Sequence, residues 1–144
     1  MCREYLTQLR ERIEEFNEQN VKIYVIAPSN AQFISQFLDA FGPFPFPIVG
    51  DPERAAYYEM GHHTSPKWKL LSKAALGLIF GKLKNFIPKD EHQKEVVLKS
   101  MKTADVYIQG GTYLYSENGD LFWQHTDSSP EDHAKIDTVL EKLT

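Results

Sequence analysis

The sequence is poor in cysteine: Cys2 is the only one among its 144 residues. A single cysteine rules out a disulfide within the chain. The N-terminus carries no apolar segment of the signal-peptide type, so we expect a cytoplasmic protein. The longest apolar-rich stretch, Ala74 to Ile87, is interrupted by Lys82, Lys84 and Asn85 and is too short and too charged to span a bilayer. We therefore expect no membrane partner.

The chain also lacks a run of basic residues interleaved with aromatics, so we expect no nucleic-acid partner. Its charge is nevertheless uneven, because residues 61–102 carry nine basic and three acidic side chains between two acidic flanks. A basic centre suits an anionic ligand or a membrane surface, or it is a solvated helix face that pairs with the acidic flanks. With 42% hydrophobic residues, the chain can bury one core, so we expect a single domain over residues 1–144 without a structural metal or a cofactor.

Apolar residues at helical spacing predict a first helix from about Cys2 to Gln19: they are Leu6, Leu9, Ile13 and Phe16. Cys2 heads this helix on its apolar side. A thiol at a helix N-terminus faces unpaired N–H groups and the positive end of the helix dipole, and both favour the thiolate. Cys2 is therefore either a reactive nucleophile or a small buried side chain, and its position alone leaves both open.

Strand and helix signals then alternate along the chain. Val21–Ile26 is an apolar run rich in β-branched residues, which predicts a buried parallel strand. The segment after it ends at Asn30, which suits the N-cap of a following helix. The helix that follows is predicted to end at Gly42 as a left-handed cap. Ile48 and Val49 form a short strand after a proline-rich stretch. This order predicts an α/β layered fold with right-handed crossovers.

The middle of the chain begins with a further helix signal. The segment 51–53, Asp-Pro-Glu, predicts an N-cap with proline at the first helical position, and Gly61 is predicted to end that helix. His62 and His63 are adjacent and cannot both reach one metal from regular structure, so we expect no metal site there. Residues 66–102 predict a helical insertion in two pieces divided by Pro88. Composition leaves open whether it is a surface insertion, an oligomer interface or a lid.

The last third predicts a hairpin and a closing helix. Two aromatic-rich runs, 106–115 and 121–125, are joined by Asn118 and Gly119, for which we expect positive φ at both residues. The segment 129–132, Ser-Pro-Glu-Asp, predicts the start of the closing helix. Its apolar stripe consists of Ile136, Val139, Leu140 and Leu143.

Together these segments resemble the peroxiredoxin-like, AhpC/TSA-type branch of the thioredoxin superfamily. The most specific parts are the Cys-Arg-Glu helix start at Cys2, the Gln-Gly-Gly-Thr segment 109–112 and the Ser-Pro-Glu-Asp-His segment 129–133. The resemblance implies a thioredoxin-like fold with a mixed central sheet flanked by helices. Because the sequence begins at the first helix, the N-terminal central strand is expected to be missing, through a truncated reading frame, a misassigned start codon or divergence.

The resemblance also implies an activity. Such proteins are thiol oxidoreductases that reduce peroxides or disulfides and take electrons from an external thiol. Cys2 falls on the second cysteine of their Cys-x-x-Cys pair, which implies a resolving role, and alone it supports one-cysteine chemistry. Gln109 stands where these proteins place an arginine near the thiolate and cannot supply that charge. Arg3 adjoins the thiol in the sequence and is the candidate substitute, although an arginine in a first helical turn usually points to solvent. Gly111 and Thr112 occupy the slot of the thioredoxin cis-proline. We thus expect Cys2 as the catalytic residue, with Arg3, Gly111 and Thr112 binding substrate.

Two other interpretations stay open. A non-catalytic thioredoxin-fold binding or scaffold module would keep Cys2 as an idle thiol, and a carrier would hold a lipid-like or anionic ligand around residues 68–86. A missing strand would also leave open edges on strands 21–26 and 112–115. Those strands would pair directly, borrow a strand from another copy in a homodimer, or depend on residues upstream of Met1.

Overall fold

The computed structural model describes residues 3–66, 89–96 and 106–144. In chain order the elements are α1 (Arg3–Glu11), α2 (Ile13–Glu18), β1 (Val25–Ala27), α3 (Ala31–Phe41), β2 (Ile48–Gly50), α4 (Ala55–Glu59), β3 (Thr64–Pro66), β4 (Val106–Ile108), β5 (Gly111–Tyr115), β6 (Leu121–Thr126) and α7 (Ile136–Leu143). A helical segment also covers residues 91–96. Over these ranges, no helix is long and apolar enough to cross a membrane. Cys2 and most of the predicted insertion lie outside the described residues.

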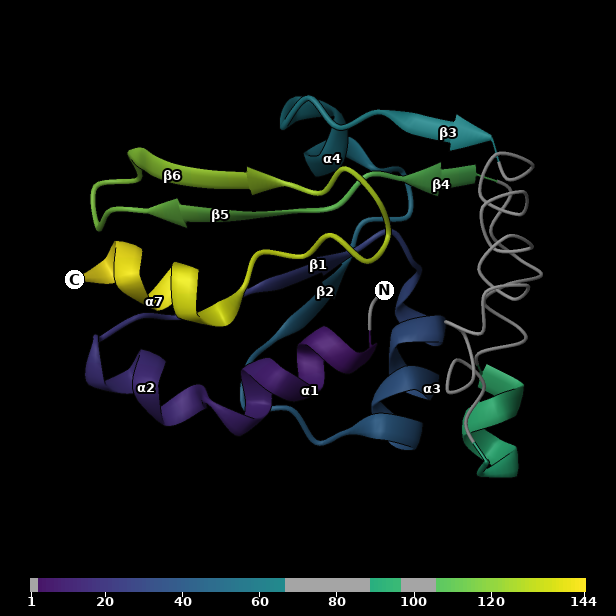
Figure 1. The fold of residues 1–144 in the computed structure, drawn as a ribbon. Helices are drawn as coiled ribbons and strands as arrows, with labels where there is room; N and C mark the ends of the chain where they lie inside the picture. The colour runs from purple at the N-terminus through teal and green to yellow at the C-terminus, as the bar shows by residue number, and fades with distance from the viewer. Residues whose placement is uncertain (1–2, 67–88, 97–105) are drawn as a thin grey trace, which may run out of the picture.

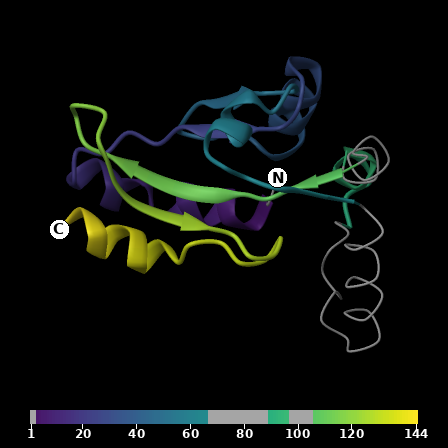
Figure 2. The same cartoon turned by 90° about the horizontal axis from the view of Figure 1, so that it is seen from above.

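The strands of the described ranges form three two-stranded ladders. β1 pairs with β2 in parallel, β3 with β4 antiparallel, and β5 with β6 antiparallel. In Figure 1 the helices α1 and α2 lie beneath the ladders. In Figure 2 the β1–β2 ladder, with α3 and α4, lies on one side of the molecule, and the β5–β6 hairpin, with α7, lies on the other. Helices and parallel and antiparallel strands are combined as the predicted mixed α/β class requires.

One hydrophobic core joins these layers. Its buried side chains are Leu6, Leu9, Phe16, Phe37, Phe46, Leu114, Ala134, Ile136 and Val139. Val25 of β1 and Ile48 of β2 pack against the same core. In the described part of the chain, however, β1 bonds only to β2 and β5 only to β6. The alternative in which strands 21–26 and 112–115 pair directly is therefore wrong for this structure.

The predicted first helix is broken at Arg12. This residue has φ −109° and ψ 19°, and the Glu15 N–H bonds to the Arg12 carbonyl at 3.2 Å, which tightens the turn between α1 and α2. The Arg12 guanidinium bonds to Glu15 and also to Asp137 of α7. The break thus coincides with an ion pair between Arg12 and the other end of the chain.

The predicted strand 21–26 and the predicted cap at Gly42 also need correction. β1 is confined to Val25–Ala27, because its partner β2 is short and follows Pro45 and Pro47, which have no N–H to donate to a longer ladder. Gly42 has φ −76° and is not left-handed, since a residue before proline is pushed to extended backbone. It is still needed, because a Cβ there would lie 2.5 Å from the Leu38 carbonyl oxygen.

Two helices begin later than predicted. The Asp51 carboxylate does accept backbone N–H bonds, from Ala55 at 3.0 Å and Ala56 at 2.9 Å, but α4 starts only after Arg54, which has φ 61°. Gly61 ends this region with φ 75°, as predicted. α7 starts at Ile136, because residues 128–132 form a separate turn. In both places, hydrogen bonds made by residues outside the helix fix the backbone conformation of the segment that precedes it.

The β5–β6 turn differs from the two-residue form that was predicted. Gly119 has φ 86°, but Asn118 does not have positive φ. The Gly119 N–H bonds to the Ser116 carbonyl at 3.0 Å, and the Asp120 N–H bonds to Ser116 Oγ at 3.1 Å. The connection is therefore a longer turn in which one glycine takes the left-handed position.

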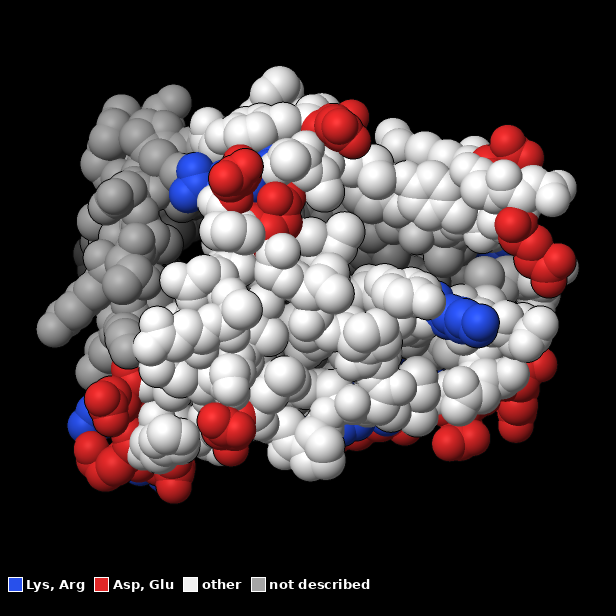
Figure 3. Space-filling view, turned by 180° about the vertical axis from the view of Figure 1, so that it is seen from behind, with Lys and Arg blue, Asp and Glu red and all other residues white. Residues whose placement is uncertain are grey.

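One side of the β1–β2 ladder exposes apolar side chains. Ile26 and Val49 are register partners and are 43% and 47% exposed, and Tyr24 lies two residues before Ile26 on the same side of the strand. Figure 3 views the molecule from behind, where β1, β2 and α4 lie, and shows a broad area with few charged side chains. We call Tyr24, Ile26 and Val49 the β1–β2 face.

Candidate functional site

The start of β5 and the end of β6 meet at Asp127. In the ladder, Gly111 lies opposite Thr126. Just beyond it, the Asp127 N–H donates to the Gly110 carbonyl at 3.0 Å, and Gln109 Nε2 donates to the Asp127 carbonyl at 2.8 Å. These two bonds fix the Asp127 backbone against the segment that leads into β5.

The Asp127 side chain is a buried carboxylate, with a residue exposure of 3%. Its Oδ2 atom lies 2.8 Å from His133 Nδ1, and because a carboxylate only accepts, this nitrogen carries the proton. His125 Nε2 lies 3.7 Å from Oδ1 of the same carboxylate. Gly110 makes room for it, since a Cβ there would lie 2.8 Å from Oδ2. A buried charge is tolerated only with such partners.

The turn at residues 128–132 brings His133 back to Asp127. The Asp132 carboxylate accepts hydrogen bonds from Ser128 Oγ at 2.6 Å and from Ser128 N at 2.9 Å. The side-chain bond, followed by the backbone bond, holds the pKa of Asp132 below its usual value. His125 Nε2 donates to the Asp132 carbonyl at 2.9 Å. Both histidines are thus oriented by bonds within one short turn.

Helix α1 brings Tyr5 to the same place. Leu6 and Leu9 are buried in the core and anchor the helix. The Tyr5 ring stacks on the His133 imidazole, with ring centroids 5.0 Å apart. Burial raises the pKa of Tyr5, a hydrogen bond with Thr112 lowers it, and the charge of Asp127 raises it. The first helix therefore contacts the acid–base pair directly.

His62 lies on the other side of the β5 start and is 6% exposed. Its Nε2 atom lies 2.8 Å from the Tyr113 hydroxyl. Burial lowers the pKa of His62, and the nearby charge of Asp127 opposes that shift. Gly111 allows this approach, because a Cβ there would lie 2.9 Å from His62 Cε1. We call the following residues the histidine cluster: His62, Tyr113, His125, Asp127 and His133.

The four residues predicted for the site lie in different places. Gly111 and Thr112 border the histidine cluster. Arg3 begins α1 and turns to α3, with its guanidinium carbon 5.4 Å from the centre of the Phe41 ring. Cys2 lies outside the described residues, directly before Arg3 in the sequence. The structure thus brings two predicted residues together with acid–base groups that had not been assigned a role.

The histidine cluster can hold and transfer a proton. An imidazole hydrogen-bonded to a carboxylate is a common acid–base pair, and here the pair is oriented by the surrounding backbone. Within the described ranges, no three His, Cys, Asp or Glu side chains converge as a metal site would require. The hydrogen-bonded Asp127–His133 pair is suited to proton transfer.

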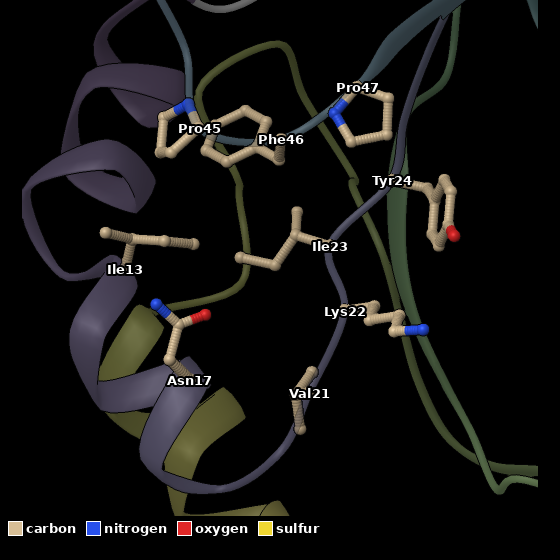
Figure 4. Close-up of a pocket in the computed structure, with 9 residues that line it drawn as sticks. All are labelled: Ile13, Asn17, Val21, Lys22, Ile23, Tyr24, Pro45, Phe46 and Pro47. Atoms are coloured by element: carbon tan, nitrogen blue, oxygen red, sulfur yellow. The ribbon is translucent and has the colours of Figure 1, made fainter.

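A small hollow of about 190 Å³ lies elsewhere in the molecule (Figure 4). Ile13, Ile23 and Phe46 line it together with other mainly apolar residues, while Lys22 and Tyr24 point away from its centre. None of the residues of the histidine cluster lines this hollow. Its two titratable side chains, Lys22 and Tyr24, do not point into it, so it is not a candidate for the reaction site.

The arrangement of the elements is that of a thioredoxin-like α/β protein, with a parallel strand pair, an antiparallel hairpin and a closing helix. The model of the AhpC/TSA antioxidant enzyme family matches residues 8–129, which is most of the chain. The chain therefore belongs to this family, which confirms the resemblance seen in the sequence. At the level of the family, the function is that of a thiol-dependent oxidoreductase. No curated protein and no solved structure gave a significant match.

Several of these groups were not predicted from the sequence. The segment that ends in Asp132 and His133 is part of the family resemblance, but no role was predicted for either residue. Asp127 and Tyr5 were not identified at all. One signal was available, because His125 and Asp127 are two residues apart at the end of a predicted strand and so share one side of it.

Proposed function

We propose that the chain is a peroxiredoxin-like thiol oxidoreductase whose reactive group is Cys2. The observation that carries this proposal is the contact of Tyr5 with the Asp127–His133 pair. Cys2 precedes Tyr5 by three residues, which span at most about 11 Å of extended chain. The thiol is thereby tied to the neighbourhood of an acid–base pair, and membership of the family supplies the type of chemistry.

In the proposed first step, the Cys2 thiolate attacks one oxygen of a peroxide. A sulfur–oxygen bond forms and the oxygen–oxygen bond breaks, so the sulfur is oxidised to a sulfenic acid and the peroxide is reduced. The leaving oxygen needs a proton, and we assign its delivery to Nε2 of His133, which takes this proton from the Cys2 thiol as the thiolate forms while Asp127 holds Nδ1. In this proposal Arg3 favours the thiolate through its charge, and Gly111 and Thr112 border the approach of the substrate.

An external thiol completes the cycle. Its sulfur attacks the sulfenic sulfur of Cys2, which gives a mixed disulfide and releases water. A second thiol attacks the mixed disulfide, restores the Cys2 thiol and leaves as a disulfide. In total, one peroxide and two thiols give one alcohol or water from the leaving oxygen, one further water and one disulfide. One cysteine in the protein is sufficient for this cycle.

The test is straightforward because iodoacetamide can label only one cysteine. We expect the pH midpoint of labelling to lie below about 8.5, the value of a free cysteine. Peroxide consumption with dithiothreitol should depend on the protein and be lost in Cys2→Ser, whose free energy of unfolding should change little. Consumption that survives in Cys2→Ser would contradict the proposal. So would a labelling midpoint at or above the free-thiol value combined with no turnover, which would favour a non-catalytic module.

A further inference from the structure

A basic groove lies beside the start of α1, bordered by α1, α3 and the helical segment 91–96. It is a hollow of about 660 Å³, within the range of about 300–1,000 Å³ that is typical of small-molecule sites. Three of its residues, Arg3, Thr7 and Arg10, follow one another at helical spacing and so share one side of α1. Lys89 and Gln93 line it from the direction of the segment 91–96.

The charge in this groove is mostly positive. Arg3, Arg10 and Lys89 line it together with one carboxylate, that of Asp90. Among the described residues, none of the three cations forms an ion pair. The Asp90 carboxylate accepts the Gln93 N–H at 3.0 Å and so caps its own helical segment. The groove therefore presents an excess of positive charge to a ligand.

The two arginines differ in how far their donors are already used. Arg10 lies over the Phe44 ring at 5.1 Å and donates to the Phe41 carbonyl at 3.1 Å. Arg3 lies over the Phe41 ring, but in the described structure its guanidinium donates no hydrogen bond. Stacking limits the motion of this guanidinium while its N–H groups stay available, which lowers the entropy cost of binding an anion.

We infer that this groove binds the carboxylates of a small anionic peptide thiol, the reductant of the proposed cycle. The inference rests on the proposed function, because that cycle consumes two external thiols. Arg3 directly follows Cys2, so a ligand held by Arg3 has its sulfur near the start of the chain. Guanidinium groups bind carboxylates through paired N–H bonds, and Lys89 adds a second positive charge for a second carboxylate.

Binding can be measured without any redox reaction. The probe is S-methylglutathione, a peptide with two carboxylates and a blocked thiol, and its affinity is measured by isothermal titration calorimetry. Lys89→Gln should weaken binding up to about fivefold, as expected for one exposed charge pair, and added salt should weaken it further. Lys94→Gln is the matched control, since Lys94 lies on the same helical segment, pairs with Glu91 and does not line the groove.

The kinetic test separates the groove from the activity. In Lys89→Gln the KM for glutathione should rise, whereas the KM for neutral dithiothreitol should stay unchanged. Failure of S-methylglutathione to bind, or an equal effect of Lys89→Gln and Lys94→Gln, would overturn the inference even if Cys2-dependent turnover with dithiothreitol upholds the proposed function. Binding that depends on Lys89 without Cys2-dependent turnover with any thiol would uphold the groove and overturn the proposed function.

Discussion

The Nδ1 atom of His133 lies 2.8 Å from the Oδ2 atom of Asp127, and the two residues stand on either side of the turn at 128–132. The carboxylate is almost fully buried, and the imidazole N–H supplies a hydrogen-bond donor to it where bulk solvent has little access. The pair therefore contributes to the fold whether or not it takes part in a reaction.

Asp127→Asn is expected to destabilise the protein by about 1–2 kcal/mol, because the charge-assisted bond to His133 becomes a neutral one while the site stays buried. Urea denaturation followed by circular dichroism measures this free energy of unfolding. Asp120→Asn, at an exposed position in the β5–β6 turn, serves as the control. An equal and small effect of both substitutions would show that the buried pair is not stabilising.

Acidification is expected to destabilise the protein partly through His62. Burial lowers the pKa of this side chain below 6.5, the value that applies to the unfolded chain, although Asp127 and Gln109 oppose the shift. Its contribution is therefore fully present above about pH 7 and is lost as pH falls below 6.5, since the unfolded state then binds a proton that the folded state does not. Urea midpoints at about pH 7.5 and 5.5 should differ less in His62→Gln than in the unmodified protein. His92→Gln, at an exposed position, should leave the difference as it is.

Gly119→Val is expected to cost at least ~1 kcal/mol, because Gly119 has φ 86° and a β-branched residue is strained there. Asn118→Ala is the matched control in the same turn. Since Asn118 does not have positive φ, its replacement should change the free energy of unfolding by less than about 0.5 kcal/mol. Equal denaturation midpoints for the two variants would mean that the turn has a different conformation.

Two adjacent tyrosines in α4 allow a matched comparison. The Tyr57 hydroxyl donates to the Ile26 carbonyl at 2.6 Å, whereas Tyr58 is 53% exposed. Tyr57→Phe should destabilise the protein by about 1 kcal/mol, and Tyr58→Phe by less than about 0.5 kcal/mol. Thermal or urea unfolding of both variants measures this difference in the free energy of unfolding. If Tyr57→Phe were neutral, the bond would not contribute to the free energy of unfolding.

We expect two copies of the chain to associate through the β1–β2 face or through the edges of β1 and β5 that have no partner strand among the described residues. Exposed apolar side chains and unpaired strand edges both favour such contacts. Size-exclusion chromatography with light scattering should show a dimer, and Ile26→Lys should shift it towards the monomer. Gln124→Lys, on the exposed part of β6, is the control. A monomer at all accessible concentrations would contradict this expectation.

The types of most elements could be predicted from the sequence, whereas most of their ends could not. Periodic apolar residues such as Leu6 and Leu9 identify a helix because burial of one side is a local pattern. At the break, Arg12 pairs with Asp137, which is distant in the sequence, and the short β1 lies beside a strand that follows two prolines. Local patterns carry no information about such partners.

The same distinction applies to the site. Gly111 and Thr112 were predicted from a family pattern at the start of a hairpin, and they do border acid–base groups. The contact of Tyr5 with His133 joins the first helix to the segment before the last one, so no spacing rule could reveal it. The short strand β3 was also missed, because three residues without alternation give no strand signal.

The close approach of Gly111 to His62 restricts how this protein can change during evolution. A methyl group at position 111 would meet the imidazole at 2.9 Å and the His125 carbonyl oxygen at 2.8 Å. A relative with alanine at this position would therefore need a smaller side chain in place of His62 and a displaced β6. Positions 62 and 111 are expected to vary together among homologues, and a larger residue at position 111 that keeps His62 should be selected against.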